Sequence, residues 1–137
     1  MKPTLTAGLS ATATIAVDQP RTIDFMGEAA RVYATPMLVR DIEMTARDLL
    51  LAHLDPGEDS VGTRVEIDHL AATLLGQQVT LKVTVAEVKG RAVALEVEGH
   101  DGVDTICRGR HHRFVVDVKA TEARLAAKAA KAGLVKP

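Results

Sequence analysis

The sequence predicts an α+β fold in which a five-stranded antiparallel sheet wraps around one long helix. Three observations lead to this prediction. Residues 5–17 are rich in Thr and β-branched side chains, as is typical of a strand. Apolar side chains then recur at helical spacing after Thr35. From residue 63 to 118 the period changes to two, which indicates half-buried strands. A single helix that covers one face of such a sheet is an α+β layer arrangement.

The helix is predicted to begin at Thr35 and to end at Asp55-Pro56-Gly57. Thr35 is a favourable N-cap, and Pro36 at the next position has a φ suited to a first helical residue. One face is apolar because hydrophobic residues recur at i, i+4, i+8, i+11 and i+12. These residues are Leu38, Ile42, Ala46, Leu49 and Leu50.

The strands that follow are predicted to form a meander with one wet face. Apolar and polar residues alternate over 63–68, 79–86 and 93–98, and a last strand runs from about 103 to 118. Lys89-Gly90-Arg91 and Asp101-Gly102 supply the turns. The remaining residues, 119–137, are predicted to form a helix or tail. Thr121 would cap an Ala-rich helix over 122–131, which is expected to be marginal.

Composition favours one domain over residues 1–137, with its core at about 5–118. Hydrophobic residues make up 47% of the chain, which is enough to fold without a metal or disulfide staple. The net charge of −1 and the scarcity of aromatic residues argue against nucleic acid as a partner. No apolar run approaches the roughly 18 residues of a membrane span. The single Cys107 and the absence of a signal-peptide pattern favour the cytoplasm.

Three polar residues on different local structures are candidates for acyl transfer. Thr35 offers a hydroxyl, Glu43 a carboxylate and His69, at the end of a strand, an imidazole. Each also has a structural interpretation. Thr35 could only cap the helix, Glu43 could pair with Arg40 or Arg47, and His69 could be a polar residue at a turn.

The stretch 108–113 is basic and has two interpretations. It could face the phosphates of a nucleotide, or it could be a solvated strand face. His111 and His112 are adjacent on a strand and therefore point to opposite faces, so they cannot bind one metal together. The sequence contains no zinc-ligand spacing and no glycine-rich nucleotide motif, so neither a metal nor a cofactor is expected.

Several local motifs occur together in this chain: Val32-Tyr33-Ala34-Thr35, Glu43, Leu54-Asp55-Pro56-Gly57-Glu58, Val61-Gly62-Thr63, His69 and His100-Asp101-Gly102-Val103-Asp104. Taken together, they resemble the fluoroacetyl-CoA thioesterase family of hotdog proteins. The resemblance extends from about residue 32 to 118.

The resemblance implies a hotdog fold and hydrolysis of a small acyl-CoA thioester, with coenzyme A present only as part of the substrate. It also implies a homodimer with its sites at the subunit interface. The family's catalytic Thr–Glu–His set falls on Thr35, Glu43 and His69. A glycine near the thioester falls on Gly62, and an arginine of the last strand falls on Arg113.

The physics of the sheet also favours a dimer. One helix on five strands leaves a sheet edge that must be covered or paired, and two edges can join into a continuous sheet. The sequence does not distinguish a dimer from a dimer of dimers.

The resemblance has one departure and leaves two other functions open. The family has an aromatic lid segment upstream of its threonine, whereas residues 26–31 contain no Phe. The hydrolytic set therefore carries over, whereas the aromatic lid is not matched and the sequence does not decide fluoroacetyl selectivity. The first alternative is a hotdog hydratase or dehydratase acting on an enoyl or hydroxyacyl thioester. The second is an acyl-CoA or small-ligand binding module without turnover.

Overall fold

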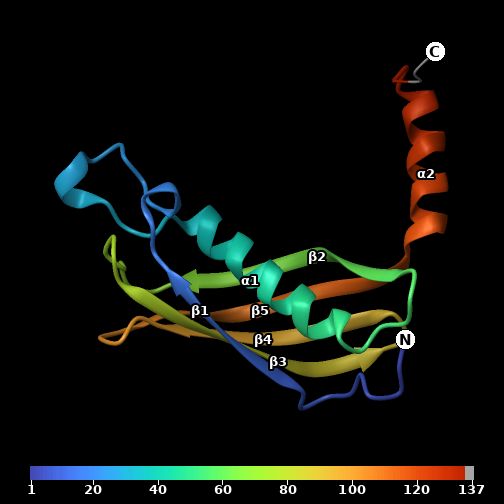
Figure 1. Cartoon of the computed structure of the whole chain (residues 1–137), viewed down its shortest axis with the longest axis horizontal. Coiled ribbons are helices and arrows are strands. Elements are labelled where there is room, and N and C mark those ends of the chain that lie inside the picture. Colours follow the sequence, from blue (N-terminus) through green and yellow to red (C-terminus); the bar gives the residue numbers. More distant parts are fainter. Residues whose placement is uncertain (135–137) are drawn as a thin grey trace.

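One long helix lies across one face of a five-stranded antiparallel sheet in the structure, a computed structural model that describes residues 1–134 (Figure 1). The strands lie in the order β1-β3-β4-β5-β2, so β1 and β2 form the two edges. Two short 3-10 turns, at Gln19–Arg21 and Glu28–Ala30, lie between β1 and α1. The main elements are β1 (Ser10–Ala16), α1 (Thr35–Leu51), β2 (Glu58–His69), β3 (Gln78–Lys89), β4 (Ala92–His100), β5 (Thr105–Asp117) and α2 (Val118–Lys131).

The core lies between α1 and the sheet. The predicted apolar face of α1 is confirmed, because Leu38, Ile42, Ala46 and Leu50 are all fully buried. Leu49 is only half-buried at its margin. The side chains of the sheet that complete this core are mostly aliphatic, as the scarcity of aromatic residues requires. They include Leu81, Val83, Leu95 and Ile106.

The start of α1 differs from the prediction in one residue that matters for the site. The N-cap is Ala34, which has no side-chain oxygen, and Thr35 is the first helical residue. Pro36 follows inside the first turn. Backbone N–H groups of this turn have no acceptor within the helix, so proline costs no hydrogen bond there. The predicted capping role of Thr35 is therefore wrong, and its hydroxyl is available for another contact.

The edge strand β2 begins at Glu58, five residues earlier than predicted, and carries a β-bulge. Gly62 pairs with Arg113 of β5, whereas Arg64 pairs with the preceding residue, His112. Thr63 is thus the extra residue, and the alternation of side chains restarts after it. As a result Gly62 and His69, seven positions apart, both face α1.

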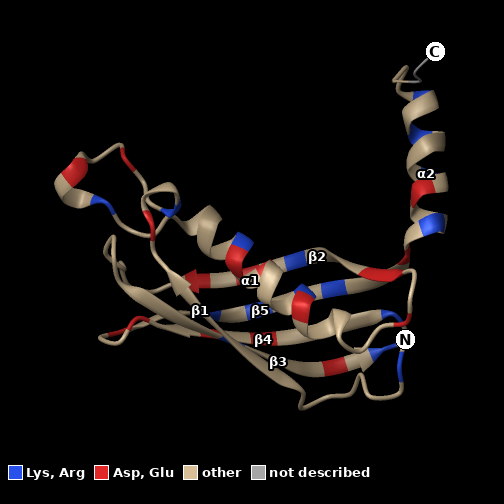
Figure 2. Ribbon diagram, in the orientation of Figure 1, with Lys and Arg blue, Asp and Glu red and all other residues tan. Residues whose placement is uncertain are grey.

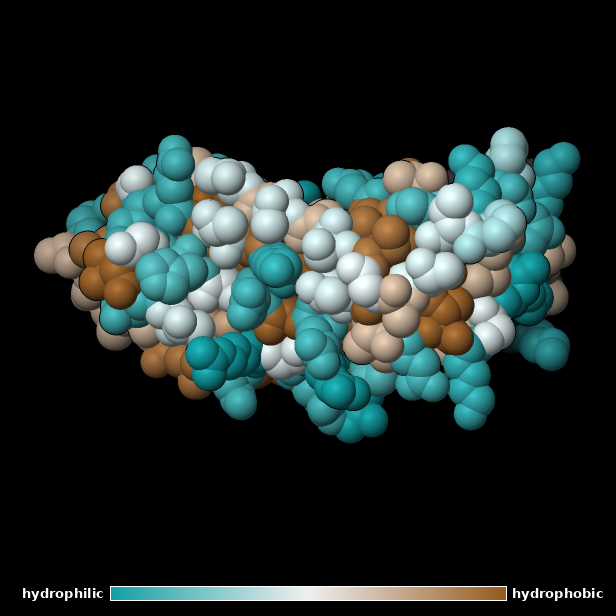
Figure 3. All heavy atoms as spheres, turned by 90° about the horizontal axis from the view of Figure 1, so that it is seen from below, coloured by the Kyte–Doolittle hydropathy of each residue, from teal (hydrophilic) through white to brown (hydrophobic). Residues whose placement is uncertain are grey.

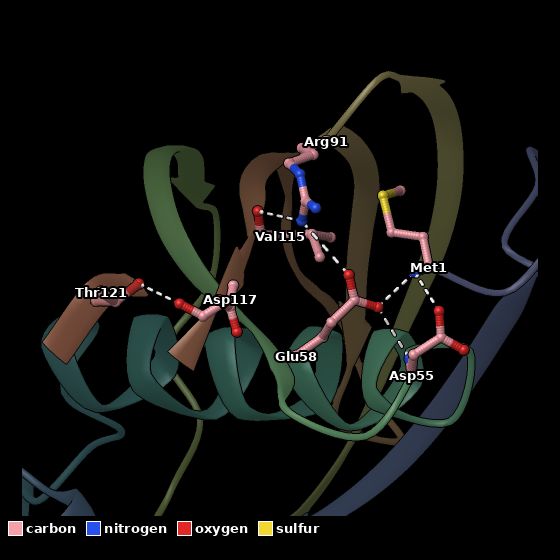
Figure 4. Close-up of polar contacts among 7 residues, drawn as sticks. All are labelled: Met1, Asp55, Glu58, Arg91, Val115, Asp117 and Thr121. Carbon is pink, nitrogen blue, oxygen red and sulfur yellow. Dashed lines mark hydrogen bonds and ion pairs between the residues drawn. The ribbon is translucent and has the colours of Figure 1, made fainter. Parts of the chain in front are cut away.

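The second helix, α2, stands away from the rest of the molecule (Figure 1). Its N-cap is Asp117 and not Thr121, whose hydroxyl donates to the carbonyl of Asp117 at 2.9 Å. Figure 4 shows this junction beside Glu58, whose carboxylate accepts from the backbone N–H of Asp55 at 2.9 Å. The backbone N–H of Val118 donates to the carbonyl of Gly57 at 2.9 Å, which fixes the helix to the start of β2.

Seen from below, apolar residues form separate patches between polar ones (Figure 3). Within residues 1–134, no helix is long and apolar enough to cross a membrane.

Candidate functional site

Thr35 and His69 meet where the end of β2 lies beside the start of α1. The Oγ1 atom of Thr35 and the Nδ1 atom of His69 are 2.7 Å apart, a hydrogen bond. The ring of Tyr33 lies edge-on to the imidazole, with the ring centres 6.4 Å apart. A hydroxyl bonded to an imidazole is the arrangement that allows a base to activate a nucleophile.

The surroundings of His69 favour its neutral form. The ring is half-buried, and burial lowers the pKa of His69 below its ordinary value. Its Nε2 atom is enclosed and has no hydrogen-bond partner within residues 1–134. When Nδ1 accepts from the Thr35 hydroxyl, the single proton of the neutral ring lies on Nε2, and the lone pair of Nδ1 can take up a proton from that hydroxyl near neutral pH.

A cavity of about 550 Å³ opens beside this pair. Its walls are mainly apolar and come from the segment before α1 and from the residues that follow His69. Phe25, whose side chain is 79% exposed, contributes an aromatic ring to the lining. The other apolar walls include Ile23, Val32, Leu70, Ala71 and Ala72.

A buried ion pair holds the segment before α1 in place. Asp41 is 3% exposed and accepts hydrogen bonds from the hydroxyl of Tyr33 and from Arg21, whose Nε lies 2.9 Å away. Burial, together with the Asp41 carboxylate, raises the pKa of Tyr33, so its hydroxyl remains a donor. This network fixes the Tyr33 ring against His69.

Glu43 lies elsewhere in the same chain. Eight residues along α1 separate it from Thr35, which is about 12 Å at 1.5 Å per residue. Its half-buried carboxylate abuts Gly62, because a Cβ atom placed on Gly62 would lie 2.3 Å from Glu43 Oε1. Arg47, a predicted alternative partner, binds Asp59 instead at 2.7 Å.

Arg113 is buried on the face of the sheet that α1 covers. It is 5% exposed, and its Nε and Nη2 donate to the hydroxyl and the carbonyl of Ser60, both at 2.7 Å. Its Nη1 lies 3.2 Å from the Nε2 of His111, which is fully buried. Arg113 therefore does not belong to an exposed phosphate-facing edge, whereas Arg108 and Arg110 are exposed on the outer face.

The imidazole of His111 secures the bulge of β2. Its Nδ1 lies 2.9 Å from the carbonyl oxygen of Arg64, the residue that follows the bulge. Burial lowers the pKa of His111, and the guanidinium of Arg113 adds to this effect, so the ring is neutral. Nδ1 then carries the proton and donates it to Arg64, while Nε2 accepts from Arg113.

The predicted site residues thus fall into two groups within one chain. Thr35 and His69 form the first, while Glu43, Gly62 and Arg113 form the second. Sequence reasoning missed the parts that Phe25, Tyr33, Asp41, Ser60 and His111 play. Only His111 left a usable signal, because it lies two residues before Arg113 in a strand and must share its face.

The side chains do not suggest a metal centre. Within residues 1–134, no group of three or more His, Cys, Asp or Glu side chains is arranged to hold a metal ion.

Comparisons with known proteins point to one family. The family model described as fluoroacetyl-CoA-specific thioesterase matches residues 17–119. A fluoroacetyl-CoA thioesterase from Streptantibioticus cattleyicolor is 36% identical over 98 residues, which are 72% of this chain and 70% of that protein.

Solved structures show the same fold. The crystal structure of a variant of the fluoroacetyl-CoA-specific thioesterase FlK superposes with a TM-score of 0.85 at 31% identity, covering 93% of this chain and 99% of the other. A thioesterase superfamily member from Thermus thermophilus gives 0.88 at 27% identity, covering 98% and 100%. The expected hotdog fold is confirmed, and the chain belongs to the fluoroacetyl-CoA-specific thioesterase family.

Proposed function

We propose that the protein hydrolyses a small acyl-CoA thioester in the cavity beside Thr35 and His69. As a member of its family it is a thioester hydrolase, and acyl-CoA is its class of substrate. The observation that carries the proposed site is the 2.7 Å bond between the Thr35 hydroxyl and the His69 imidazole at the cavity wall. The apolar lining and its modest volume suit a short acyl chain.

In the proposed reaction, His69 accepts the proton of the attacking oxygen at Nδ1. That oxygen is the Thr35 hydroxyl itself, or a water that Thr35 holds. The tetrahedral intermediate then expels the coenzyme A thiolate, which takes up the proton from His69. In the first case a water molecule then hydrolyses the acyl-threonine, which releases the acid and restores the Thr35 hydroxyl. A burst of thiol release in the first turnover would identify the acyl-threonine route.

A complete site requires two chains. Gly62 and His69 lie on one strand and are separated by six regular steps and one bulge residue, which is about 20 Å at roughly 3.3 Å per step and too far to contact one thioester. They can share a site only if one of them comes from a second copy. Because β2 is an edge strand, it can pair with the β2 of the partner in an antiparallel manner and extend the sheet.

The bulge at Thr63 makes such a pairing self-consistent. Thr63 is left out of the count because it is the extra residue of the bulge. If Gly62 lies opposite His69 of the partner subunit, the pairs then converge on Glu66, which lies on the two-fold axis. The half-buried Val65 then faces Ile67 of the partner subunit. On the outer face, Arg64 lies opposite Asp68 of the partner subunit, an attractive pair. The two copies of Glu66 face each other, but each contacts Arg64 of its own chain.

This pairing carries Glu43 of the partner subunit to the Thr35–His69 pair, because Glu43 abuts Gly62. Its carboxylate would orient the substrate or water and balance the charge that forms on His69. The proposed dimer thus unites the two groups of site residues. The side chains and water suffice for this mechanism, and the lone buried Cys107 fits a cytoplasmic location.

Thiol release from a panel of acetyl, fluoroacetyl, medium-chain and arylacetyl-CoA esters tests the proposed activity. Thr35→Ala and His69→Ala should each lower kcat by about 10²–10⁴. Turnover that survives both substitutions would overturn the proposed site. A change in acyl unsaturation without thiol release would indicate a hydratase, and saturable binding with neither product would indicate a binding module.

A cysteine substitution tests the proposed dimer. Glu66→Cys should form a disulfide between subunits on mild oxidation, because the two Cβ atoms would face each other across the axis. Asp68→Cys is the matched control and should not, since it would face Arg64 of the partner subunit. Cross-linking of the control alone would refute the register.

A further inference from the structure

The helix α2 is the least integrated element of the chain. Within residues 118–131 no side chain is buried. Its start is nevertheless firmly placed, because Asp117 pairs with Glu58 at the beginning of β2 and Val118 bonds to Gly57. A helix that is rigidly attached at one end and exposed along its length is suited to contact something outside its own chain.

The proposed dimer brings α2 to the other subunit's cavity. In that register the residues before Gly62 run alongside the residues that follow His69 of the partner subunit. Glu58, beside the start of α2, therefore lies near the segment 70–73 of the partner. Leu70, Ala71 and Ala72 of that segment line the cavity. This step depends on the proposed function and its dimer.

The side chains of α2 have two adjacent stripes at helical spacing. Val118 and Leu125 lie on one face and are 37% and 59% exposed. Beside them Arg124, Lys128 and Lys131 recur at i, i+4 and i+7, within about 60° of one another around the axis. We call these three residues the cationic stripe, and Figure 2 shows basic residues along the length of α2.

The described lining of the cavity has no cationic side chain that could bind a phosphate. Its lining comes from the described segments 23–36 and 69–72 and includes no lysine or arginine. Coenzyme A carries a pyrophosphate and a 3′-phosphate at the end remote from the thioester, and these groups need cations. Arg113 cannot serve them, because its guanidinium is buried against Ser60.

We propose that the cationic stripe of one subunit binds the phosphates of an acyl-CoA whose thioester lies in the other subunit's cavity. Val118 and Leu125 would rest on exposed apolar residues beside that cavity, such as Leu70, which is 55% exposed. Each site then uses the other subunit twice, once for the carboxylate of Glu43 and once for the nucleotide end of the substrate.

Comparing an acyl-CoA with the same acyl ester of pantetheine separates phosphate binding by the cationic stripe from catalysis. A variant with Arg124→Gln, Lys128→Gln and Lys131→Gln should raise KM for an acyl-CoA about tenfold, since each exposed charge pair gives about a two- to fivefold effect. Its kcat should be unchanged. The same acyl ester of pantetheine carries none of these phosphates, so its KM should not respond. Lys119→Gln, on the opposite side of α2, is the control and should leave both substrates unaffected.

Mixed dimers test whether the stripe acts across the interface. In one dimer, a subunit carrying Thr35→Ala together with the neutralised stripe is paired with an unmodified subunit. The only working cavity then faces the neutralised stripe, and KM for acyl-CoA should rise. In the second dimer the two changes are on different subunits, so the working cavity faces an intact stripe and KM should be normal. The reverse pattern would show that α2 serves its own subunit and would overturn the proposal.

The outcomes separate this inference from the proposed function. An unchanged KM for acyl-CoA in the stripe variant, with thiol release intact, would refute the role of α2 and leave the hydrolase standing. Failure of the parent protein to release thiol from either kind of ester would overturn both.

Discussion

Replacing Gly62 by alanine should lower the activity of this protein while leaving its free energy of unfolding nearly unchanged. A Cβ atom at this position would lie 2.3 Å from Glu43 Oε1 and 3.2 Å from His111 Cε1. Ordinary contact begins near 3.4 Å, so the carboxylate must move by about 1 Å. It can do so because it is the end of a flexible side chain, at a cost of about 1 kcal/mol or less.

The expected result of Gly62→Ala is a nearly unchanged free energy of unfolding, since alanine also recovers about 0.5–1 kcal/mol over glycine in a strand. Activity should fall by about 10²-fold, the typical effect of a 1 Å misplacement of a reacting group. Thiol release from an acyl-CoA and urea unfolding, measured on the same preparation, test this prediction. Unchanged kcat/KM in the folded variant would refute the argument that the position of Glu43 matters.

Gly109→Ala is the control for this experiment. Its Cβ would lie 1.9 Å from the backbone oxygen of Glu66, and backbone atoms in a sheet cannot move aside as a side chain does. Stability should fall by about 3 kcal/mol, at the upper end of overpacking effects. If Gly62→Ala were equally destabilising, the premise that Glu43 simply moves would be wrong.

Three further predictions concern stability. Burial lowers the pKa of His69 and of His111. Below about pH 6.5 the unfolded chain therefore binds more protons than the folded chain, and the free energy of unfolding falls as the pH falls. The urea midpoint should therefore fall between pH 7.5 and 5.5, and a midpoint that rises would contradict this sign. Arg113→Lys should cost about 1–3 kcal/mol in urea unfolding, because an ammonium cannot reproduce the three bonds to Ser60 and His111. Leu38→Ala should cost about 2–5 kcal/mol by leaving a core cavity, whereas the exposed Met44→Ala should cost under about 0.5 kcal/mol.

Periodicity was sufficient to predict most of the fold. The apolar face of α1 follows from the spacing of Leu38, Ile42, Ala46 and Leu50, and burial is the reason that this spacing exists. The strand after residue 5 was predicted too early, because β1 begins at Ser10 while Leu5 is buried outside any strand. A short Thr-rich segment has no local feature that marks where ladder pairing begins.

The site was predictable only in part, because it depends on contacts between distant segments. The pattern Thr-Pro is typical of an N-cap, and no local feature shows that Thr35 lies one position further in, with its hydroxyl bonded to His69. The position of Glu43 against Gly62 depends on the register between β2 and β5. Register comes from the packing of the whole sheet and not from any one strand.

The bulge at Thr63 also constrains how this protein can change over time. Because Thr63 is the extra residue, losing one residue here together with the bulge would restore regular alternation and leave Gly62 and His69 six positions apart, still on one face. Losing or gaining one residue while the bulge remains would instead turn Gly62 away from α1 relative to His69, and no point substitution could compensate for that change of face. Between Gly62 and His69 this chain can therefore lose a single residue only together with its bulge, so relatives that share this chemistry should have either this spacing with a bulge or one residue fewer without it.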